Sequence, residues 1–423
     1  MKNKYEIYKK TDFDWIGYIP SDWDVSKIKK ESIKNQRGNT PKYEENDDIK
    51  IYPILNQACV YNKYIKFEKQ KFNTVPPKGL KGNLQLNDIL LCSTGGGTAG
   101  RIGFWNYSFD NYIVDSHLTI IRMDKNIYSK YYYYLLLSSK FKDQIYACIN
   151  GATNQEELSN VRLNEMPIIK PSLMEQTAIA NYLDKKTSSI EDSIETLKSQ
   201  KERLIEQKKA IIHKAVTKGL DDSVEMKDSG VYLLKEYPLD WNIGNLKEFF
   251  KFSMGNTILK EDLNTTKKGY PVYSATEKDK FFGYVNEINL TLNKNDIVIP
   301  ARGNSIGYVK IVKQKSTTTQ TTIAGISKNK INTFFAYYYL TGLKELIFVY
   351  DNTAIPQYTV QDANNIKIVF PELIEQNNIV KYLDKKTSKI DEAVSEVDKQ
   401  IGLLNEYKKT LINDVVTGKV KVV

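Results

Sequence analysis

The sequence predicts an α+β protein in which two mixed, mainly β globular parts are each followed by one long helix. A helical stretch at 175–217 recurs at 375–417 without a gap. Landmarks of the preceding globular part also recur, in the same order but with drifting spacing. Short runs rich in β-branched and aromatic residues, bounded by glycine, asparagine or proline, are typical of strands. Because the repeat is far longer than a solenoid unit, it indicates a duplicated module.

The globular parts share their starting motif and several later landmarks. Pro20-Ser21-Asp22-Trp23 recurs as Pro238-Leu239-Asp240-Trp241. Insertions between such landmarks are tolerated in loops, which absorb added length at small thermodynamic cost. The aromatic clusters at 131–134 and 334–339 favour core packing over base stacking. The predicted strands are 49–60, 88–92, 113–123, 166–170, 296–300, 307–312, 321–326 and 366–370, and the predicted helical stretches are 128–149 and 332–350.

The two long helical stretches carry an apolar residue at every seventh position. The first begins EQTAIANYLDKKTS and the second begins EQNNIVKYLDKKTS. A heptad pattern sustained over this length, with charged residues on the other faces, predicts a coiled coil. The alternative is an amphipathic helix lying on a globular core. The predicted seam residues are Leu183, Ile190, Ile194, Leu197, Leu204, Ile211, Leu383, Ile390, Val394, Val397, Leu404 and Leu411.

The ends of both long helices can be identified from the sequence. Ser172 and Glu175 fit a capping box at the start of the first helix. Gly219 and Gly418 supply the residue that tolerates left-handed backbone where each helix ends. A serine that could start a fresh helix leaves open a break near Thr187.

Composition and motifs argue against several classes of protein. The 423 residues carry a formal net charge of +10 that is spread along the chain, which allows a polyanionic partner, although a lysine-rich proteome would produce it too. Three scattered cysteines and two isolated histidines argue against a disulfide framework, a zinc site and a multi-histidine metal centre. Without an apolar signal core or a run of about 18 apolar residues, we expect a cytoplasmic protein with no membrane span.

Motifs for catalysis are also absent from the sequence. The glycine-rich stretch at 95–100 lacks the lysine of a phosphate-binding loop, and no metalloprotease, nucleophile-elbow or amino-methyltransferase motif occurs. A chain of this length without such a constellation is expected to be a binding protein and not an enzyme.

Polar loops in both globular parts are the candidate DNA-binding elements. Arginine suits guanine edges, asparagine and glutamine suit adenine edges, and hydroxyls and backbone amides suit phosphates. Glycines let the backbone approach a ligand closely. The alternative for each residue is an ordinary turn or surface position. The candidates are Arg37, Asn39, Thr40, Thr94, Thr98, Arg101, Asn154 and Gln155 in the first part, and Asn256, Thr257, Arg302, Asn304, Ser305, Gln320, Gln357 and Tyr358 in the second.

These features together resemble the DNA-specificity subunits of type I restriction-modification systems. The resemblance rests on the Pro-x-Asp-Trp starts, the Asn-Asp-Ile strands followed by glycine-rich loops with arginine, and the duplicated Glu-Gln…Tyr-Leu-Asp-Lys-Lys-Thr helices. It covers essentially the whole chain. The domains it implies are a target-recognition domain at 1–170 with a lead-in at 1–19, a helix at 171–218, a linker at 219–235, a second target-recognition domain at 236–370, and a helix with the C-terminal tail at 371–423.

The resemblance implies a fold and a function. The two helices would form an antiparallel coiled coil that relates the recognition domains by a pseudo-two-fold repeat. Each domain would bind one half of an asymmetric, bipartite double-stranded DNA target. The helices would dock methyltransferase subunits, typically two, that bind S-adenosylmethionine, and a nuclease-translocase subunit would complete the restriction complex. This subunit would need no cofactor of its own and would have no catalytic activity.

Two other classes of function stay open at this level. One is a structural coiled-coil scaffold without DNA specificity, which predicts no salt-dependent DNA binding. The other is a self-contained DNA-modifying enzyme, which predicts methyl transfer from labelled S-adenosylmethionine without a partner. A further expectation concerns the helices: if they act as a ruler, inserting four residues into both should lengthen the unspecific spacer of the target.

Overall fold

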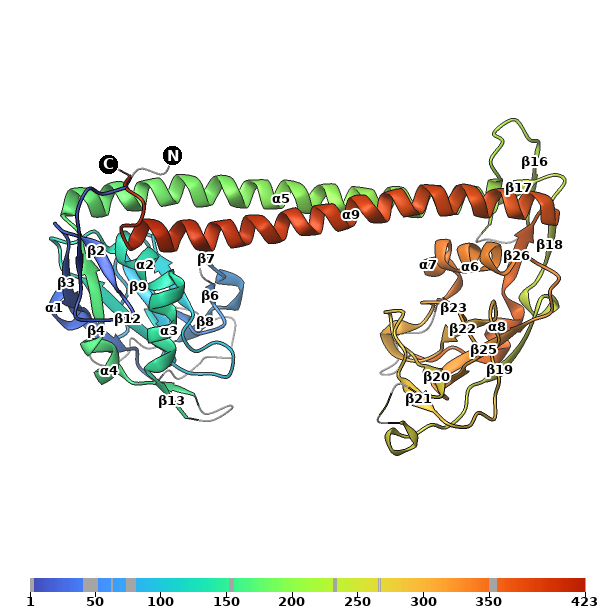
Figure 1. The fold of residues 1–423 in the computed structure, drawn as a ribbon, viewed down its shortest axis with the longest axis horizontal. Coiled ribbons are helices and arrows are strands. Elements are labelled where there is room, and N and C mark those ends of the chain that lie inside the picture. Colours follow the sequence, from blue (N-terminus) through green and yellow to red (C-terminus); the bar gives the residue numbers. More distant parts are fainter. Residues whose placement is uncertain are drawn as a thin grey trace. The chain divides into compact units, whose positions relative to one another are not determined.

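The computed structural model describes residues 4–40, 52–61, 64–73, 81–151, 156–230, 234–264, 266, 268–349 and 356–422. The chain divides into two compact units. The first unit comprises Met1–Thr196 and Lys399–Val423, and the second comprises Leu197–Asp398. Each unit therefore holds one globular part together with a portion of both long helices (Figure 1).

The first globular part is built around a four-stranded antiparallel sheet in the order β10-β9-β12-β4. A second sheet, in the order β11-β5-β8, pairs β11 with β5 in parallel. Small two-stranded sheets join β1 to β2, β3 to β15, β6 to β7 and β13 to β14. The strand bounds are β1 Tyr8–Lys10, β2 Tyr18–Pro20, β3 Asp24–Lys27, β4 Ser32–Arg37, β5 Tyr52–Leu55, β6 Val60–Tyr61, β7 Tyr64–Ile65, β8 Lys71–Asn73, β9 Asp88–Cys92, β10 Ile102–Trp105, β11 Ile113–Val114, β12 Leu118–Met123, β13 Ile149–Asn150, β14 Glu157–Leu158 and β15 Pro167–Lys170.

The second globular part repeats this topology. Its four-stranded sheet has the order β23-β22-β25-β19, and its three-stranded sheet has the order β24-β20-β21 with β24 and β20 parallel. The small sheets join β16 to β17 and β18 to β26. The strand bounds are β16 Met226–Asp228, β17 Glu236–Pro238, β18 Asn242–Asn245, β19 Phe250–Met254, β20 Tyr270–Tyr273, β21 Gly283–Val285, β22 Ile297–Pro300, β23 Lys310–Ile311, β24 Thr317–Thr318, β25 Thr322–Ser327 and β26 Lys367–Phe370. The predicted duplication and fold class are confirmed.

Short helices connect the strands in both parts. Where the sequence predicts a single helical stretch at 128–149, the structure has two helices, because the backbone of Ser138 is extended between them. The predicted strand at 113–123 is likewise divided into β11 and β12 by a turn. The helix bounds are α1 Ile28–Glu31, α2 Ser129–Leu137, α3 Ser139–Ala147, α4 Asn160–Glu165, α6 Thr333–Gly342, α7 Lys344–Ile347 and α8 Val360–Asn365.

The cores lie on both faces of the four-stranded sheets. In the first part, Leu90 and Leu118 pack with Leu55 between the two sheets. The opposite face packs against α2 and the long helices, and the rings of Tyr131 and Tyr132 are buried there. The predicted role of the tyrosine cluster in core packing is therefore confirmed.

The long helices α5 (Leu173–Lys218) and α9 (Leu373–Val416) are uninterrupted. The break considered near Thr187 is absent, since Thr187 is buried within α5 and lies 3.3 Å from the hydroxyl of Tyr134. Every predicted seam residue is buried or half-buried. None of the helices in the described ranges is both long and apolar enough to cross a membrane.

Ion pairs across the seam show that α5 and α9 run in opposite directions (Figure 1). In the second unit, Lys201 pairs with Asp398 at 2.7 Å, whereas Lys208, further along α5, pairs with the earlier Asp391 at 2.6 Å. Lys201 and Lys208 lie four residues after the seam residues Leu197 and Leu204, and their ammonium groups reach carboxylates of the opposite helix. The predicted antiparallel coiled coil is confirmed.

The caps of the long helices match the sequence prediction. The amide of Glu175 donates to Ser172 Oγ over 3.3 Å, which is one half of a capping box, and Ser172 Oγ donates to Glu175 Oε2 at 3.0 Å. Gly219 and Gly418 have φ angles of +79° and +73°, the left-handed conformation that ends a helix without a Cβ penalty.

The shared Glu-Gln sequence attaches each long helix to its own globular part. Gln176 Nε2 donates to the carbonyl of Pro171 at 2.8 Å, and its Oε1 accepts from the amide of Tyr128 at 3.0 Å. Gln376 makes the same two bonds, to Pro371 and from Asn332, both at 2.8 Å. These buried glutamines satisfy backbone groups that would otherwise be costly to bury.

Candidate DNA interface

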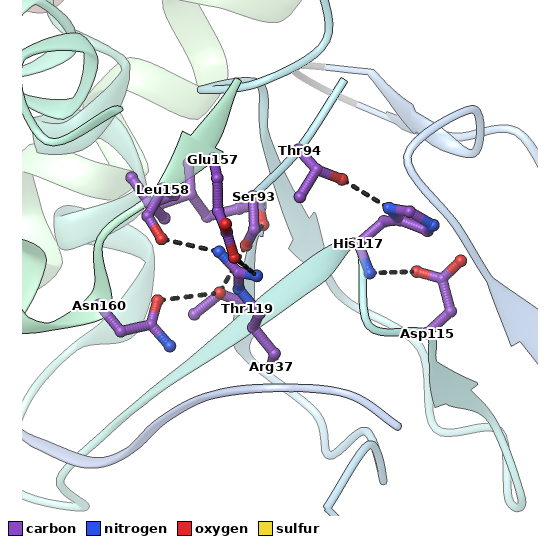
Figure 2. Close-up of polar contacts among 10 residues, drawn as sticks. Arg37, Ser93, Thr94, Asp115, His117, Thr119, Glu157, Leu158 and Asn160 are labelled. Atoms are coloured by element: carbon purple, nitrogen blue, oxygen red, sulfur yellow. Dashed lines mark hydrogen bonds and ion pairs between the residues drawn. The ribbon is translucent and has the colours of Figure 1, made fainter. Parts of the chain in front are cut away.

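Four segments of the first globular part meet at one end of β9 and β12. They are the stretch 37–40 after β4, the loop 93–101 after β9, the turn 115–117 before β12, and strand β14. Isolated bridges join Asn39 to Asp115 and Thr94 to Glu157. Two of the loops predicted from the sequence, together with the turn 115–117 and β14, thus form one surface region (Figure 2).

Arg37 holds this region together from within. Its Nη1 pairs with Glu157 Oε1 at 2.6 Å, and its Nη2 donates to the carbonyl of Leu158 at 2.7 Å (Figure 2). The arginine side chain is only 25% exposed. Two of its five N–H donors therefore fix β14 beside β4, one on the Glu157 carboxylate and one on the backbone carbonyl of Leu158.

A buried chain of polar groups lies beneath the surface. Ser93 Oγ and Thr119 Oγ1 are 2.6 Å apart, and Thr119 Oγ1 donates to Asn160 Oδ1 at 3.4 Å (Figure 2). The amide of Leu158 donates to the carbonyl of Ser93 at 2.8 Å. These bonds give the start of the loop after β9 a defined position relative to β12 and β14.

The imidazole of His117 is exposed at the surface near these buried polar groups. His117 Nδ1 is 2.5 Å from Thr94 Oγ1, and the amide of His117 donates to Asp115 Oδ1 at 2.9 Å (Figure 2). The Asp115 side chain is buried, whereas His117 is exposed. The turn therefore presents one polar side chain outward on a buried carboxylate anchor.

The glycine-rich loop continues the same surface. Thr98 Oγ1 donates to the carbonyl of Thr94 at 3.0 Å, and Arg101 Nη2 donates to the carbonyl of Gly97 at 3.1 Å. Gly95, Gly97 and Gly100 have φ angles of +102°, +75° and +79°, so side chains at these positions would strain the loop.

An aromatic patch adjoins Arg101, whose guanidinium lies 5.5 Å from the ring of Tyr61. The Tyr61 and Tyr64 rings stack with an interplanar angle of 8°, and Lys66 Nζ lies 4.1 Å from the Tyr61 ring. Sequence reasoning missed this patch because the two tyrosines belong to separate short strands.

The second globular part assembles the corresponding segments. Isolated bridges join Asn256 to Thr319 and Arg302 to Gln357, at the positions of the bridges in the first part. Thr257 Oγ1 donates to Gln320 Oε1 at 3.0 Å. The predicted loops of this part are therefore also brought together.

A glycine makes the bridge possible in each part. A Cβ on Gly38 would lie 2.0 Å from the carbonyl oxygen of Val114, and one on Gly255 would lie 2.3 Å from that of Thr319. Only glycine fits where two backbones approach so closely. This explains why a glycine precedes the bridged asparagine in both parts.

The remaining candidates have different surroundings. Arg302, Asn304 and Gln357 are exposed, as is Thr40 in the first part. Ser305 is buried, and its hydroxyl donates to the carbonyl of Arg302 at 3.3 Å. Asn154 and Gln155 lie outside the described residues.

Tyr358 is part of the core and does not line the surface. It is 7% exposed, and its ring centroid lies 4.9 Å from that of Phe348. Burial raises the pKa of its hydroxyl well above the ordinary value. The prediction that Tyr358 contacts DNA thus disagrees with its burial, which was not visible from its position in a polar loop.

Sequence reasoning also missed Asp115 and His117. From the sequence, the histidine is considered only as a possible metal ligand, and the turn that carries it lies within the single strand predicted at 113–123. The signal that could have identified it is the alignment of the turn 115–117 with 319–321, which precedes the corresponding strand of the second part.

Comparison with known proteins identifies the family. The model of the type I restriction modification DNA specificity domain matches residues 20–205 and again 238–399. The putative type I restriction enzyme MjaX specificity subunit of Methanocaldococcus jannaschii is 29% identical over 438 aligned residues, which cover 99% of this chain and 98% of the relative. The MjaIX specificity subunit of the same organism is 25% identical, with 98% and 96% covered.

Solved structures share the fold. A chain from work on complex assembly and conformational transition of the type I R-M system has a TM-score of 0.74 at 14% identity, with 94% of this chain and 98% of that chain covered. The HsdS subunit from Thermoanaerobacter tengcongensis has a TM-score of 0.51 at 15% identity, with 95% and 98% covered. This chain belongs to the DNA specificity subunits of type I restriction-modification systems, which direct the complex and are not themselves catalytic.

Proposed function

We propose that this subunit recognises an asymmetric, bipartite double-stranded DNA target, one half with each globular part. The observation that carries this proposal is the repeated meeting of the same segments at the same end of the same sheet in both parts. The backbone frame is kept while the side chains differ, since Thr94 in the first part corresponds to Arg302 in the second. Different side chains on one frame imply two different half-sites.

The candidate contacts divide by what their side chains are available to do. Arg37 is proposed to position β14 and not to read a base, because its Nη1 and Nη2 each bond a group of β14 and its side chain is only 25% exposed. Asn39 and Asn256 are proposed to hold the bridged loops at the surface. Asn154 and Gln155 stay candidates from the sequence. The exposed or half-exposed candidates for base or phosphate contact are Thr40, Thr94, Thr98, Arg101, Thr257, Arg302, Asn304, Gln320 and Gln357.

The partners follow from the same duplication. Two methyltransferase subunits are proposed to bind, each carrying S-adenosylmethionine, and a nuclease-translocase subunit is proposed to join them in the cytoplasm. Support comes from exposed apolar residues at matching positions, where each long helix begins. Met174 is 71% exposed and Ile374 is 79% exposed, and the preceding Leu173 and Leu373 are about half exposed. Matching apolar surfaces on both units fit two copies of one partner.

Methylome sequencing tests the target proposal. A host expressing this chain with its cognate methyltransferase subunit is compared with a host expressing the methyltransferase alone. A new two-part adenine-methylation motif that requires this chain is expected. If a verified complex produces no new motif, the chain has no DNA specificity and the scaffold alternative is favoured.

Native mass spectrometry tests the stoichiometry. The wild-type chain is expected to bind two methyltransferase copies, and Met174→Glu or Ile374→Glu alone is expected to bind one. Leu86→Glu, which changes an exposed leucine of the globular part, is the control and should still bind two. Two copies on the double variant would refute the proposed docking positions.

A further inference from the structure

The turns at 115–117 and 319–321, which we call the corners, occupy the same place in the two globular parts. In the first, the amide of Gly38 donates to the carbonyl of Leu118 at 3.1 Å. In the second, the amide of Gly255 donates to the carbonyl of Thr322 at 3.0 Å. The amide of Ser93, at the start of the loop after β9, donates to the carbonyl of His117 at 2.8 Å. The amide of Ala301, at the start of the loop after β22, donates to the carbonyl of Thr321 at 3.0 Å. The last residue of each corner and the strand residue that follows it are thus held from opposite sides.

Each corner lies at the end of its strand away from the long helix of its own part. Beyond the other end of β12, the amide of Tyr128 is bonded by Gln176 of α5. Beyond the other end of β25, the amide of Asn332 is bonded by Gln376 of α9. A strand of six residues separates the two ends by about 20 Å. The corners are therefore on the side of each part that α5 or α9 leaves open.

The two corners combine one buried anchor with one exposed reader. In the first, Asp115 is buried and bonds the backbone of His117, the exposed reader. In the second, Thr319 is 6% exposed and its hydroxyl lies 2.8 Å from that of Thr321, while Gln320 is exposed. The anchor is the first residue of each corner, whereas the reader is the third residue of the first corner and the second residue of the second, so the two parts present different residue types from different positions of one backbone frame.

A threonine from a neighbouring loop orients each reader. Thr94 Oγ1 lies 2.5 Å from His117 Nδ1, which leaves Nε2 directed away from that bond. Thr257 Oγ1 donates to Gln320 Oε1, and the amide nitrogen of Gln320 keeps its capacity to donate. A reader that is oriented before binding loses less conformational entropy on contact.

We propose that the corners determine the specificity of the two half-sites, with His117 reading one base position of the first and Gln320 one of the second. Thr94 and Thr257 act as positioning residues for these readers. This inference rests on the proposed DNA recognition by both globular parts. Gln320 suits an acceptor on a base edge, and the Nε2 of His117 suits a purine edge in the major groove.

The test compares methylomes of the complete complex with His117→Ala, Gln320→Ala and the wild-type chain. Each variant is expected to relax one base position in its own half of the motif, by about 5- to 150-fold in discrimination, and to leave the other half unchanged. Lys125→Ala and Lys330→Ala are the controls, since these exposed lysines follow the opposite ends of β12 and β25. They should leave the motif unchanged.

The outcomes separate this inference from the proposed function. A wild-type complex without a motif refutes the function itself. A wild-type motif retained by His117→Ala and Gln320→Ala, or a change spread over both halves, overturns the inference alone. If an alanine variant melts normally but methylates nothing, His117→Gln or Gln320→Asn replaces it. A changed base preference at one position of a single half-site then supports the inference. A replacement variant that still methylates no site overturns it.

The positioning role has its own readout. Thr94→Val removes the hydroxyl and should relax the same base position as His117→Ala, to a smaller extent, whereas Thr94→Ser should restore the wild-type motif. A different position affected by Thr94→Val would contradict the role of this threonine.

Discussion

The indole nitrogen of Trp23 donates a hydrogen bond to Glu175 Oε1 over 3.0 Å, and thereby joins the start of the first globular part to the start of α5. Trp241 and Glu375 make the same bond in the second part, at 3.2 Å. Both tryptophans are buried. The repeated Pro-x-Asp-Trp and Glu-Gln sequences are therefore two halves of one contact, which docks each long helix onto the domain that precedes it.

Removing the acceptor of this bond should destabilise the first unit. Glu175→Ala leaves the buried indole N–H of Trp23 and the hydroxyl of Tyr5 without their carboxylate partner. We expect a loss of about 1–3 kcal/mol in the free energy of unfolding, measured by urea denaturation. Glu175→Gln keeps an acceptor oxygen and should lose less. Equal losses for the two variants would show that the bond itself contributes little.

The close backbone approach at Gly38 predicts a large effect from a single methyl group. Gly38→Ala must displace the carbonyl of Val114, because the added Cβ would lie 2.0 Å from it. We expect destabilisation of more than about 1 kcal/mol and loss of selectivity in one half-site. Gly402→Ala is the matched control. Gly402 lies in the interior of α9 with open space around it, so alanine there should stabilise the protein by about 0.5–1 kcal/mol.

The ion pair between Lys208 of α5 and Asp391 of α9 predicts that the two charges can be exchanged with little loss of stability. Lys208→Asp or Asp391→Lys alone places like charges together and should lower the melting temperature at low salt. The double exchange restores an ion pair and should recover most of the loss. Because both side chains are partly exposed, the effect should be about 0.2–1 kcal/mol and should shrink in high salt. A double variant as unstable as the worse single one would contradict the pairing.

Glu165 predicts a pH-dependent contribution to stability. Hydrogen bonds from Lys27 and Lys29 lower the pKa of its carboxyl from 4.5 to about 2. The ionised form is favoured in the folded state, so the contribution is present above about pH 4.5 and is lost as the pH falls toward 2. The stability difference between wild type and Glu165→Gln should therefore shrink between pH 5 and pH 2, as followed by chemical denaturation. A difference that is constant over this range would exclude the mechanism.

The buried thiols predict low reactivity in the native protein. Burial raises the pKa of Cys92 to about 12 and that of Cys59 to about 11. Because the thiolate is the reactive form, iodoacetamide at pH 8 should label neither residue in the folded chain and both in urea. Peptide mass spectrometry measures the labelling. Rapid labelling of Cys92 without urea would mean that β9 opens readily beside the glycine-rich loop.

Much of the architecture could be predicted because the relevant signals are local in the sequence. The heptad spacing of Leu183 and Ile190 reports a buried helix face directly, and Gly219 marks a helix end by its own backbone preference. The gapless repeat of these signals also predicted the duplication. The antiparallel direction of the pairing was expected only from the family resemblance, since residues such as Lys208 and Asp391 have no sequence signal that relates them.

The composition of the candidate site depended on contacts between distant segments. Arg37 had the residue type of a base reader, but Glu157 and Leu158 use its donors within the fold. Tyr358 had a polar-loop sequence, but the core encloses its ring.

By itself, the sequence determined that one module occurs twice, that each copy ends in a long helix with a heptad seam, and which loops are polar and rich in glycine. The tertiary structure alone decided which of those loops meet and which side chains remain exposed, as with His117. The physical reason is that helix periodicity and turn preference act between near neighbours, whereas strand pairing brings together residues that are far apart in the chain.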